Sequence, residues 1–148
     1  MEINLYLTSE WWQQPPKCTV FFNSKKIWDG EISKEHVVNI RENETDLPSQ
    51  NRLLLRMYGK TVDETVVEDN KIVRDQLLCI KKIIINNIDI DHLVFSHGRY
   101  WPDYPPHLRQ SIPPLPMCLE KIDTLGFNGD WVFDFESPFE IWYLANLP

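Results

Sequence analysis

Apolar residues recur at every second position along much of the chain, and this alternation constrains the fold more than any other feature. In the first such segment, Ile3, Leu5 and Leu7 fall on one face. A period of two places successive side chains on opposite faces of a strand, so a half-buried strand is predicted there. Further strands are predicted at 18–22, 27–32, 37–40 and 53–58, the first two of them joined by a turn at Asn23-Ser24.

A hairpin is predicted where isoleucines flank two asparagines. The run Ile83–Ile90 has Asn86-Asn87 at its centre. A two-residue turn there pairs Ile85 with Ile88 and Ile83 with Ile90, because the turn length sets the register. We therefore expect these four isoleucines to share one buried face.

A second hairpin is predicted around Asn128-Gly129, a strong turn signal. This register pairs Thr124 with Phe133 and Ile122 with Phe135. It places Ile122, Trp131, Phe133 and Phe135 on a buried face. It also sets Asp123 opposite Asp134, which is unfavourable unless the pair lies at an exposed edge, so the alternative is a register displaced by one residue.

One helix is predicted, at 137–147. Ser137-Pro138-Phe139-Glu140 has the pattern of a capping box with proline at the first helical position. An apolar stripe follows at Phe139, Trp142, Tyr143 and Leu147. Many short strands and no alternating helices indicate an all-β fold: an antiparallel, jelly-roll-like β-sandwich. A mass of 17.6 kDa suits a single domain over 1–148.

Charge and motif content exclude several classes of function. Fifteen Lys and Arg stand against 22 Asp and Glu, a net charge of −7, which disfavours binding to a nucleic-acid backbone. Neither a secretory signal nor an apolar stretch of membrane-spanning length is recognised. Cys18, Cys79 and Cys118 are too dispersed for a zinc site and are interpreted as ordinary reduced thiols. Hydrolase and phosphate-loop motifs are missing, so we predict a protein that is not an enzyme.

The segment 96–117 contains six prolines and three large aromatic residues. Because proline donates no ladder hydrogen bond, we expect a long ordered loop or arm rather than a core strand. Its aromatic residues Tyr100, Trp101 and Tyr104 have three interpretations: stacking on sugar rings, anchoring a protein interface, or packing back onto the domain. The pair Trp11-Trp12 has the same three interpretations.

Acidic residues gather between the predicted strands at 53–58 and 83–85. Asp63, Glu64, Asp69 and Asp75 supply oxygen ligands of the kind calcium prefers, and they are the predicted metal ligands. The alternative is a solvated run of charge. His92 and His97 are interpreted as part of a solvated strand end.

The order of several motifs resembles a known group of small jelly-roll domains. The motifs are Gly59-Lys60-Thr61-x-x-Glu64-Thr65, the isoleucine hairpin, and a closing segment running from Trp131 to Phe139. They resemble calcium-dependent carbohydrate-binding modules of the xylan-binding type and related bacteriophage virion proteins, over about residues 1–95 and 119–147.

This resemblance implies a function in binding rather than catalysis. The leading prediction is a virion structural component (accessory, decoration, neck or tail/baseplate adaptor) that binds other virion proteins in a symmetric assembly and is made in the host cytoplasm. The alternative is a carbohydrate-binding module acting in glycan or host-receptor recognition. Calcium is the one cofactor candidate. Tyr100, Trp101, Tyr104, Trp11 and Trp12 are the predicted contacts with the partner or glycan.

Overall fold

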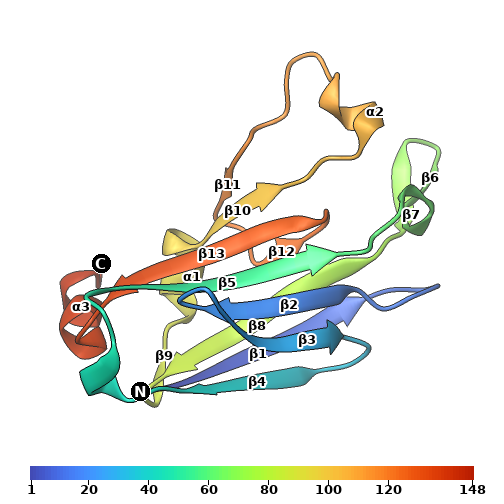
Figure 1. Ribbon diagram of the computed structural model, residues 1–148. Coiled ribbons are helices and arrows are strands. Elements are labelled where there is room, and N and C mark those ends of the chain that lie inside the picture. Colours follow the sequence, from blue (N-terminus) through green and yellow to red (C-terminus); the bar gives the residue numbers. More distant parts are fainter.

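The computed structural model describes residues 1–148, and most of its strands form two antiparallel sheets packed face to face (Figure 1). We call the five-stranded sheet A and the six-stranded sheet B. Sheet A has the order β12 (Thr124–Leu125), β8 (Leu77–Ile85), β1 (Glu2–Glu10), β4 (His36–Arg41), with β9 (Ile88–Asp89) also paired to β8. Sheet B has the order β11 (Leu119–Glu120), β10 (Arg99–Pro102), β13 (Gly129–Glu136), β5 (Gln50–Tyr58), β2 (Lys17–Phe22), β3 (Lys25–Glu31). The predicted antiparallel β-sandwich is confirmed.

The core lies between the two sheets, as the period-two pattern predicts. Ile3, Leu5 and Leu7 of β1 are fully buried from one side, and Trp131 and Phe133 of β13 from the other. They belong to one apolar cluster of 25 buried residues. Alternate residues of the same strands point outward, so sheet B also carries an outer face that can present polar side chains.

The isoleucine hairpin forms in the predicted register. Ile85 pairs with Ile88, and the Ile90 N–H donates to the Ile83 carbonyl at 3.0 Å. Asn86 and Asn87 both have positive φ, 49° and 65°, as a two-residue turn of this type requires. Ile83, Ile85 and Ile90 are buried, and Ile88 is half-buried. The predicted alternation is confirmed.

The second predicted hairpin is wrong, because the chain changes sheets at Asn128-Gly129. Thr124 and Leu125 pair with β8 in sheet A, whereas β13 pairs with β5 and β10 in sheet B. The Asn128 side chain bonds the backbone of Lys60 instead of closing a turn, accepting from its N–H at 2.9 Å and donating to its carbonyl at 3.0 Å. Asp134 therefore lies opposite Arg52, not Asp123, which removes the unfavourable carboxylate pair.

The C-terminal helix α3 (Phe139–Ala145) is present but lacks the predicted capping box. Pro138 is its N-cap residue and makes no side-chain cap hydrogen bond. The Ser137 hydroxyl instead accepts from the Asn51 amide at 2.8 Å. Phe139 is buried in the core and Leu147 is exposed.

Two further short helices, α1 (Asp91–His97) and α2 (Pro106–Arg109), contradict the expectation of one helix. Their seven and four residues are too few to show a helical period in the sequence. No helix in the structure combines the length and apolar character needed to cross a membrane.

The proline-rich segment is part strand and part loop. Arg99–Pro102 forms β10 inside sheet B, between β13 and β11, which corrects the prediction that this segment stays out of the sheets. Pro102 is tolerated because β11 pairs only with Arg99 and Tyr100, so β10 is an edge strand at Pro102. The chain between β10 and β11, which we call the projecting loop (residues 103–118), extends away from the sandwich and contains α2 (Figure 1).

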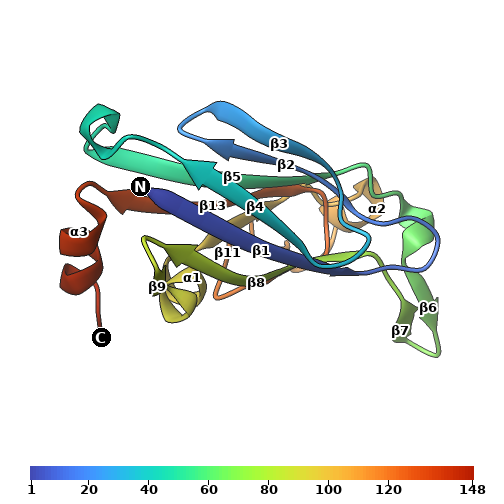
Figure 2. The ribbon, with the colours of Figure 1, turned by 90° about the horizontal axis from the view of Figure 1, so that it is seen from below.

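The remaining elements lie at the ends of the sandwich. They comprise a two-stranded ribbon of β6 (Val66–Glu68) and β7 (Lys71–Arg74) and two 3-10 turns, η1 (Glu44–Asp46) and η2 (Val62–Glu64). Figure 2 shows the ribbon at the opposite end of the molecule from α3.

Candidate functional site

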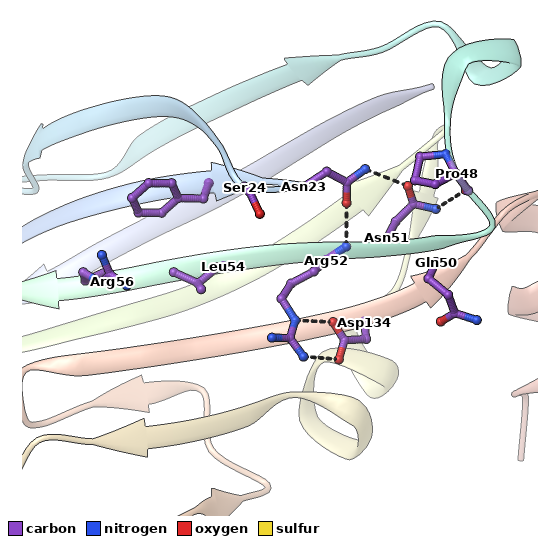
Figure 3. Close-up of a pocket in the computed structure, with 10 residues that line it drawn as sticks. Asn23, Ser24, Pro48, Gln50, Asn51, Arg52, Leu54, Arg56 and Asp134 are labelled. Atoms are coloured by element: carbon purple, nitrogen blue, oxygen red, sulfur yellow. Dashed lines mark hydrogen bonds and ion pairs between the residues drawn. The ribbon is translucent and has the colours of Figure 1, made fainter.

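The outer face of sheet B carries a groove of about 650 Å³, which we call the sheet B groove (Figure 3). Strands β2, β5 and β13 supply most of its lining, and the β2–β3 turn and the loop before β5 close one end. The lining residues are Phe21, Asn23, Ser24, Pro48, Gln50, Asn51, Arg52, Leu54, Arg56 and Asp134. Eight of these ten lining residues are not hydrophobic. The groove therefore suits a polar ligand.

Two arginine–aspartate pairs cross from β5 to β13 on this face. Arg52 binds Asp134 through Nε at 2.7 Å and through an amino group at 2.9 Å, as Figure 3 shows. Arg56 binds Asp130 in the same two-pronged way, at 2.8 and 3.1 Å. Donation of hydrogen bonds to Asp134 raises the pKa of Arg52, and donation to Asp130 raises the pKa of Arg56. Each two-pronged contact holds its two planar groups in a fixed relative orientation.

Asparagines fix the closed end of the groove. The Asn23 amide donates to the Asn51 side-chain oxygen at 2.9 Å, and the Asn23 side-chain oxygen accepts from the Arg52 backbone N–H at 2.8 Å (Figure 3). Asn51 is buried and donates to the Pro48 carbonyl at 3.2 Å and to Ser137. These bonds preorganise the groove before any ligand arrives.

The arginine–aspartate pairs leave both donors and acceptors free. A guanidinium has five N–H donors and a carboxylate about four acceptor positions, so a two-pronged pair leaves roughly three donors and two acceptors. The Arg56 guanidinium also lies over the Phe21 ring, 5.2 Å from its centroid. The groove therefore presents free donors beside free acceptors, next to apolar surface at Phe21 and Leu54.

The aromatic residues predicted to contact a partner or glycan lie in different environments. Tyr100 is 1% exposed, and its hydroxyl bonds the backbone of Phe127, so it belongs to the core and is closed to a partner. Trp101, the next residue of β10, points the other way and is 45% exposed. The Tyr104 hydroxyl donates to the Pro116 carbonyl at 2.7 Å, which ties it to the projecting loop.

Trp11 and Trp12 are the first two residues of the loop between β1 and β2. Trp11 is 41% exposed, and its indole N–H donates to the Ser33 carbonyl at 3.0 Å. The Trp12 indole N–H donates to the Glu64 carbonyl at 2.9 Å, and the Arg74 guanidinium lies over its ring. Neither residue lines the sheet B groove.

The four predicted metal ligands do not form a cluster. No group of three or more His, Cys, Asp or Glu side chains in the structure is placed to hold a metal ion. Asp75 instead binds the Lys60 ammonium at 2.6 Å and accepts from the Thr65 hydroxyl at 2.7 Å. Asp69 lies exposed at the tip of the β6–β7 ribbon. Glu64 is buried and one of its carboxylate oxygens has no hydrogen-bond partner.

The Lys60–Asp75 pair borders a second cavity, of about 740 Å³, between the projecting loop and the β6–β7 ribbon. Its walls include Tyr104 and Leu108 from the loop and Val67 and Ile72 from the ribbon. Lys60 also donates to the Gly126 carbonyl at 2.6 Å, so its ammonium is engaged on two sides. This cavity is more apolar than the sheet B groove.

The arginine–aspartate pairs escaped the sequence analysis. A signal for them exists: Arg52 and Arg56 are four residues apart on β5, and Asp130 and Asp134 have the same spacing on β13. The complementary spacing becomes informative only when β5 is known to pair antiparallel with β13. The predicted hairpin assigned β13 a different neighbour, so the match was hidden.

Comparisons with known proteins support the fold. No protein-family model and no curated protein matches the sequence. Among solved structures, vCBM60 in complex with galactobiose superimposes with a TM-score of 0.53 at 7% identity, covering 90% of this chain and 97% of that one. A selenomethionine form of vCBM60 gives a TM-score of 0.52 at 8% identity and covers 89% and 88%.

The second structure illustrates a circular permutation that links two families of calcium-dependent carbohydrate-binding modules in evolution. The chain therefore has the fold of such a module, as the sequence resemblance implies. At this level of identity the similarity establishes the fold alone.

Proposed function

We propose that this protein is a non-catalytic glycan-binding module whose binding surface is the sheet B groove. The observation that carries the proposal is the pair of two-pronged arginine–aspartate contacts beside the apolar side chains of Phe21 and Leu54. Neutral sugars present neighbouring hydroxyl groups that both donate and accept, and fixed planar side chains recognise such groups without reorganising. The vCBM60-like fold adds support, since that protein was solved with galactobiose.

A glycan array followed by calorimetry tests the proposal. Galactobiose and xylo-oligosaccharides are suitable first probes. Arg52→Gln removes one guanidinium from the groove. It is expected to lower the affinity for the glycan at least tenfold, which is a difference of about 1.4 kcal/mol in binding free energy. The matched control is Arg41→Gln in sheet A, which also loses an exposed ion pair, to Glu2 at 2.9 Å.

The control is expected to bind like the wild type. Equal losses in the two variants would contradict the groove as the site. If the protein bound no glycan on the array, the proposed glycan-binding function would be contradicted.

Calcium is the cofactor that the fold family implies, and the residues present do not fit it. Calcium takes six to eight oxygen ligands, whereas Asp75 already faces an ammonium and no acidic cluster accompanies it. We expect the melting temperature to be the same in millimolar calcium and in EDTA, because only binding to the folded state raises it. A rise in calcium would contradict this, and Asp75→Asn would then test Asp75 as a ligand.

A virion structural role is a second candidate, favoured by the projecting loop. Ile112 is 96% exposed and Met117 80%, so the loop presents apolar side chains away from the sandwich. Exposed apolar residues at the end of a long loop suit contact with another protein. Mass spectrometry of purified virus particles from the source of the chain tests this role, and absence of the protein from the particles would contradict it.

A further inference from the structure

We infer that the ligand is a linear oligosaccharide that crosses the strands of sheet B, from the sheet B groove at β2 and β5 to Trp101 on β10. The inference rests on the proposed function and names the class of glycan: a chain of several sugar residues rather than a single terminal sugar.

The strand register provides the path. Thr19, Arg56, Asp130 and Trp101 are successive partners on β2, β5, β13 and β10, so they form one row across the sheet. Phe21, Leu54, Val132 and Arg99 form the adjacent row. Alternation directs both rows to the outer face, because Tyr100 and Trp131, which lie between them in sequence, are buried in the core. Thr19 and Val132 are themselves buried within the rows, so the longer side chains beside them form the surface of the path.

Large planar groups stand at both ends of this path. The Phe21 ring lies at the β2 end, 5.2 Å from the guanidinium of Arg56 on the neighbouring strand β5. The Trp101 indole lies at the β10 end. Three interstrand spacings separate β2 from β10, roughly 14 Å. One sugar ring cannot contact both ends, whereas a short linear chain can.

The Arg56–Asp130 pair occupies the middle of the path. Asp130 is the register partner of both Arg56 and Trp101, so the bonded pair and the indole are neighbours in the same row. Trp101 is nearly half exposed although it lies within a strand, and this leaves an indole surface free for stacking. Arg52, Arg56 and Arg99 stand against Asp130 and Asp134 along the path. The excess is one positive charge, which suits an uncharged glycan.

Titration calorimetry with oligosaccharides of increasing length tests the inference. The probes are galacto- and xylo-oligosaccharides from two to six residues. For the wild type we expect affinity to rise at least tenfold from the disaccharide to the longest chain. Trp101→Ala is expected to abolish this rise while leaving disaccharide affinity within twofold, and Trp101→Phe to keep part of the rise.

Trp11→Ala is the matched control, because Trp11 has a similar exposure and lies outside the path. It is expected to retain the full dependence on chain length. Binding that is equally tight for all chain lengths overturns the inference and leaves the proposed function intact, as does an undiminished rise in Trp101→Ala. Failure of every glycan to bind overturns the proposed function and this inference with it. Unchanged melting temperatures confirm that each variant folds.

Discussion

The outer face of sheet B and the projecting loop both present side chains to solvent, but different interactions hold them in place. On sheet B, each side chain is positioned by its strand register, and the two arginine–aspartate pairs connect neighbouring strands. In the projecting loop, position depends on local bonds such as Tyr104 to the Pro116 carbonyl and Arg109 to the Tyr104 carbonyl at 2.8 Å. The sheet offers a preformed surface, and the loop offers a long reach with apolar side chains at its end.

The largest expected effect is on stability, and it comes from the core between the two sheets. Ile85→Ala is expected to lower the free energy of unfolding by roughly 2–5 kcal/mol, because it leaves a cavity in a closely packed core. Ile84→Ala, on the outer side of the same strand, is expected to cost clearly less. Chemical denaturation measures both. Equal costs would mean that the inward and outward faces are assigned incorrectly.

A second pair of variants compares the sheet with the loop directly. Tyr100→Phe removes a hydroxyl that accepts from the Phe127 N–H at 3.0 Å and donates to the Phe127 carbonyl. Leaving these groups without partners is expected to cost about 1–3 kcal/mol. Tyr104→Phe removes one hydrogen bond in the exposed loop and is expected to cost less than about 1 kcal/mol. Thermal and urea unfolding measure both costs, and the reverse order would show that the loop is the more tightly integrated region.

The smallest effect near neutral pH concerns the thiols. Burial raises the pKa of Cys18 to about 12, with a further contribution from the charge of Asp29. Since the pKa is higher in the folded state than the ordinary 9.0, this contribution to stability is complete below pH 9 and is lost as pH rises from 9 toward 12.

Labelling with a thiol reagent at pH 8 gives the corresponding kinetic measurement. Cys118 at the end of the projecting loop is half-exposed and is expected to react first, whereas Cys18 reacts only when the sandwich opens. Peptide mapping of the labelled protein identifies the order. Rapid labelling of Cys18 would contradict its place in the core.

The sequence was informative where a single strand determines the answer. The alternation in β1 and the Asn86-Asn87 turn each specify which side chains are buried, and both predictions are confirmed. The fold class follows from many such segments together. These are local signals, since the period of two and the turn length set orientation without knowledge of distant partners.

The candidate site depends on pairing between distant strands, which no local pattern reveals. Arg52 and Asp134 are 82 residues apart in the chain and meet only because β13 adds to β5. The Asn128-Gly129 dipeptide has the local signature of a hairpin, yet tertiary contacts with Lys60 direct the chain into the other sheet. Trp101 was predicted as a contact residue, and its strand neighbour Tyr100 proves to be core because alternation turns it inward.

Backbone amide NMR during titration with the tightest-binding array oligosaccharide tests the central claim most directly. The account predicts saturable shift changes concentrated on β2, β5, β13 and β10, including the amides of Arg52, Arg56, Asp130 and Trp101. Sheet A and the projecting loop are expected to remain unperturbed. Changes confined to the projecting loop, or to the second cavity beside Lys60, would contradict the assignment of the binding surface to sheet B.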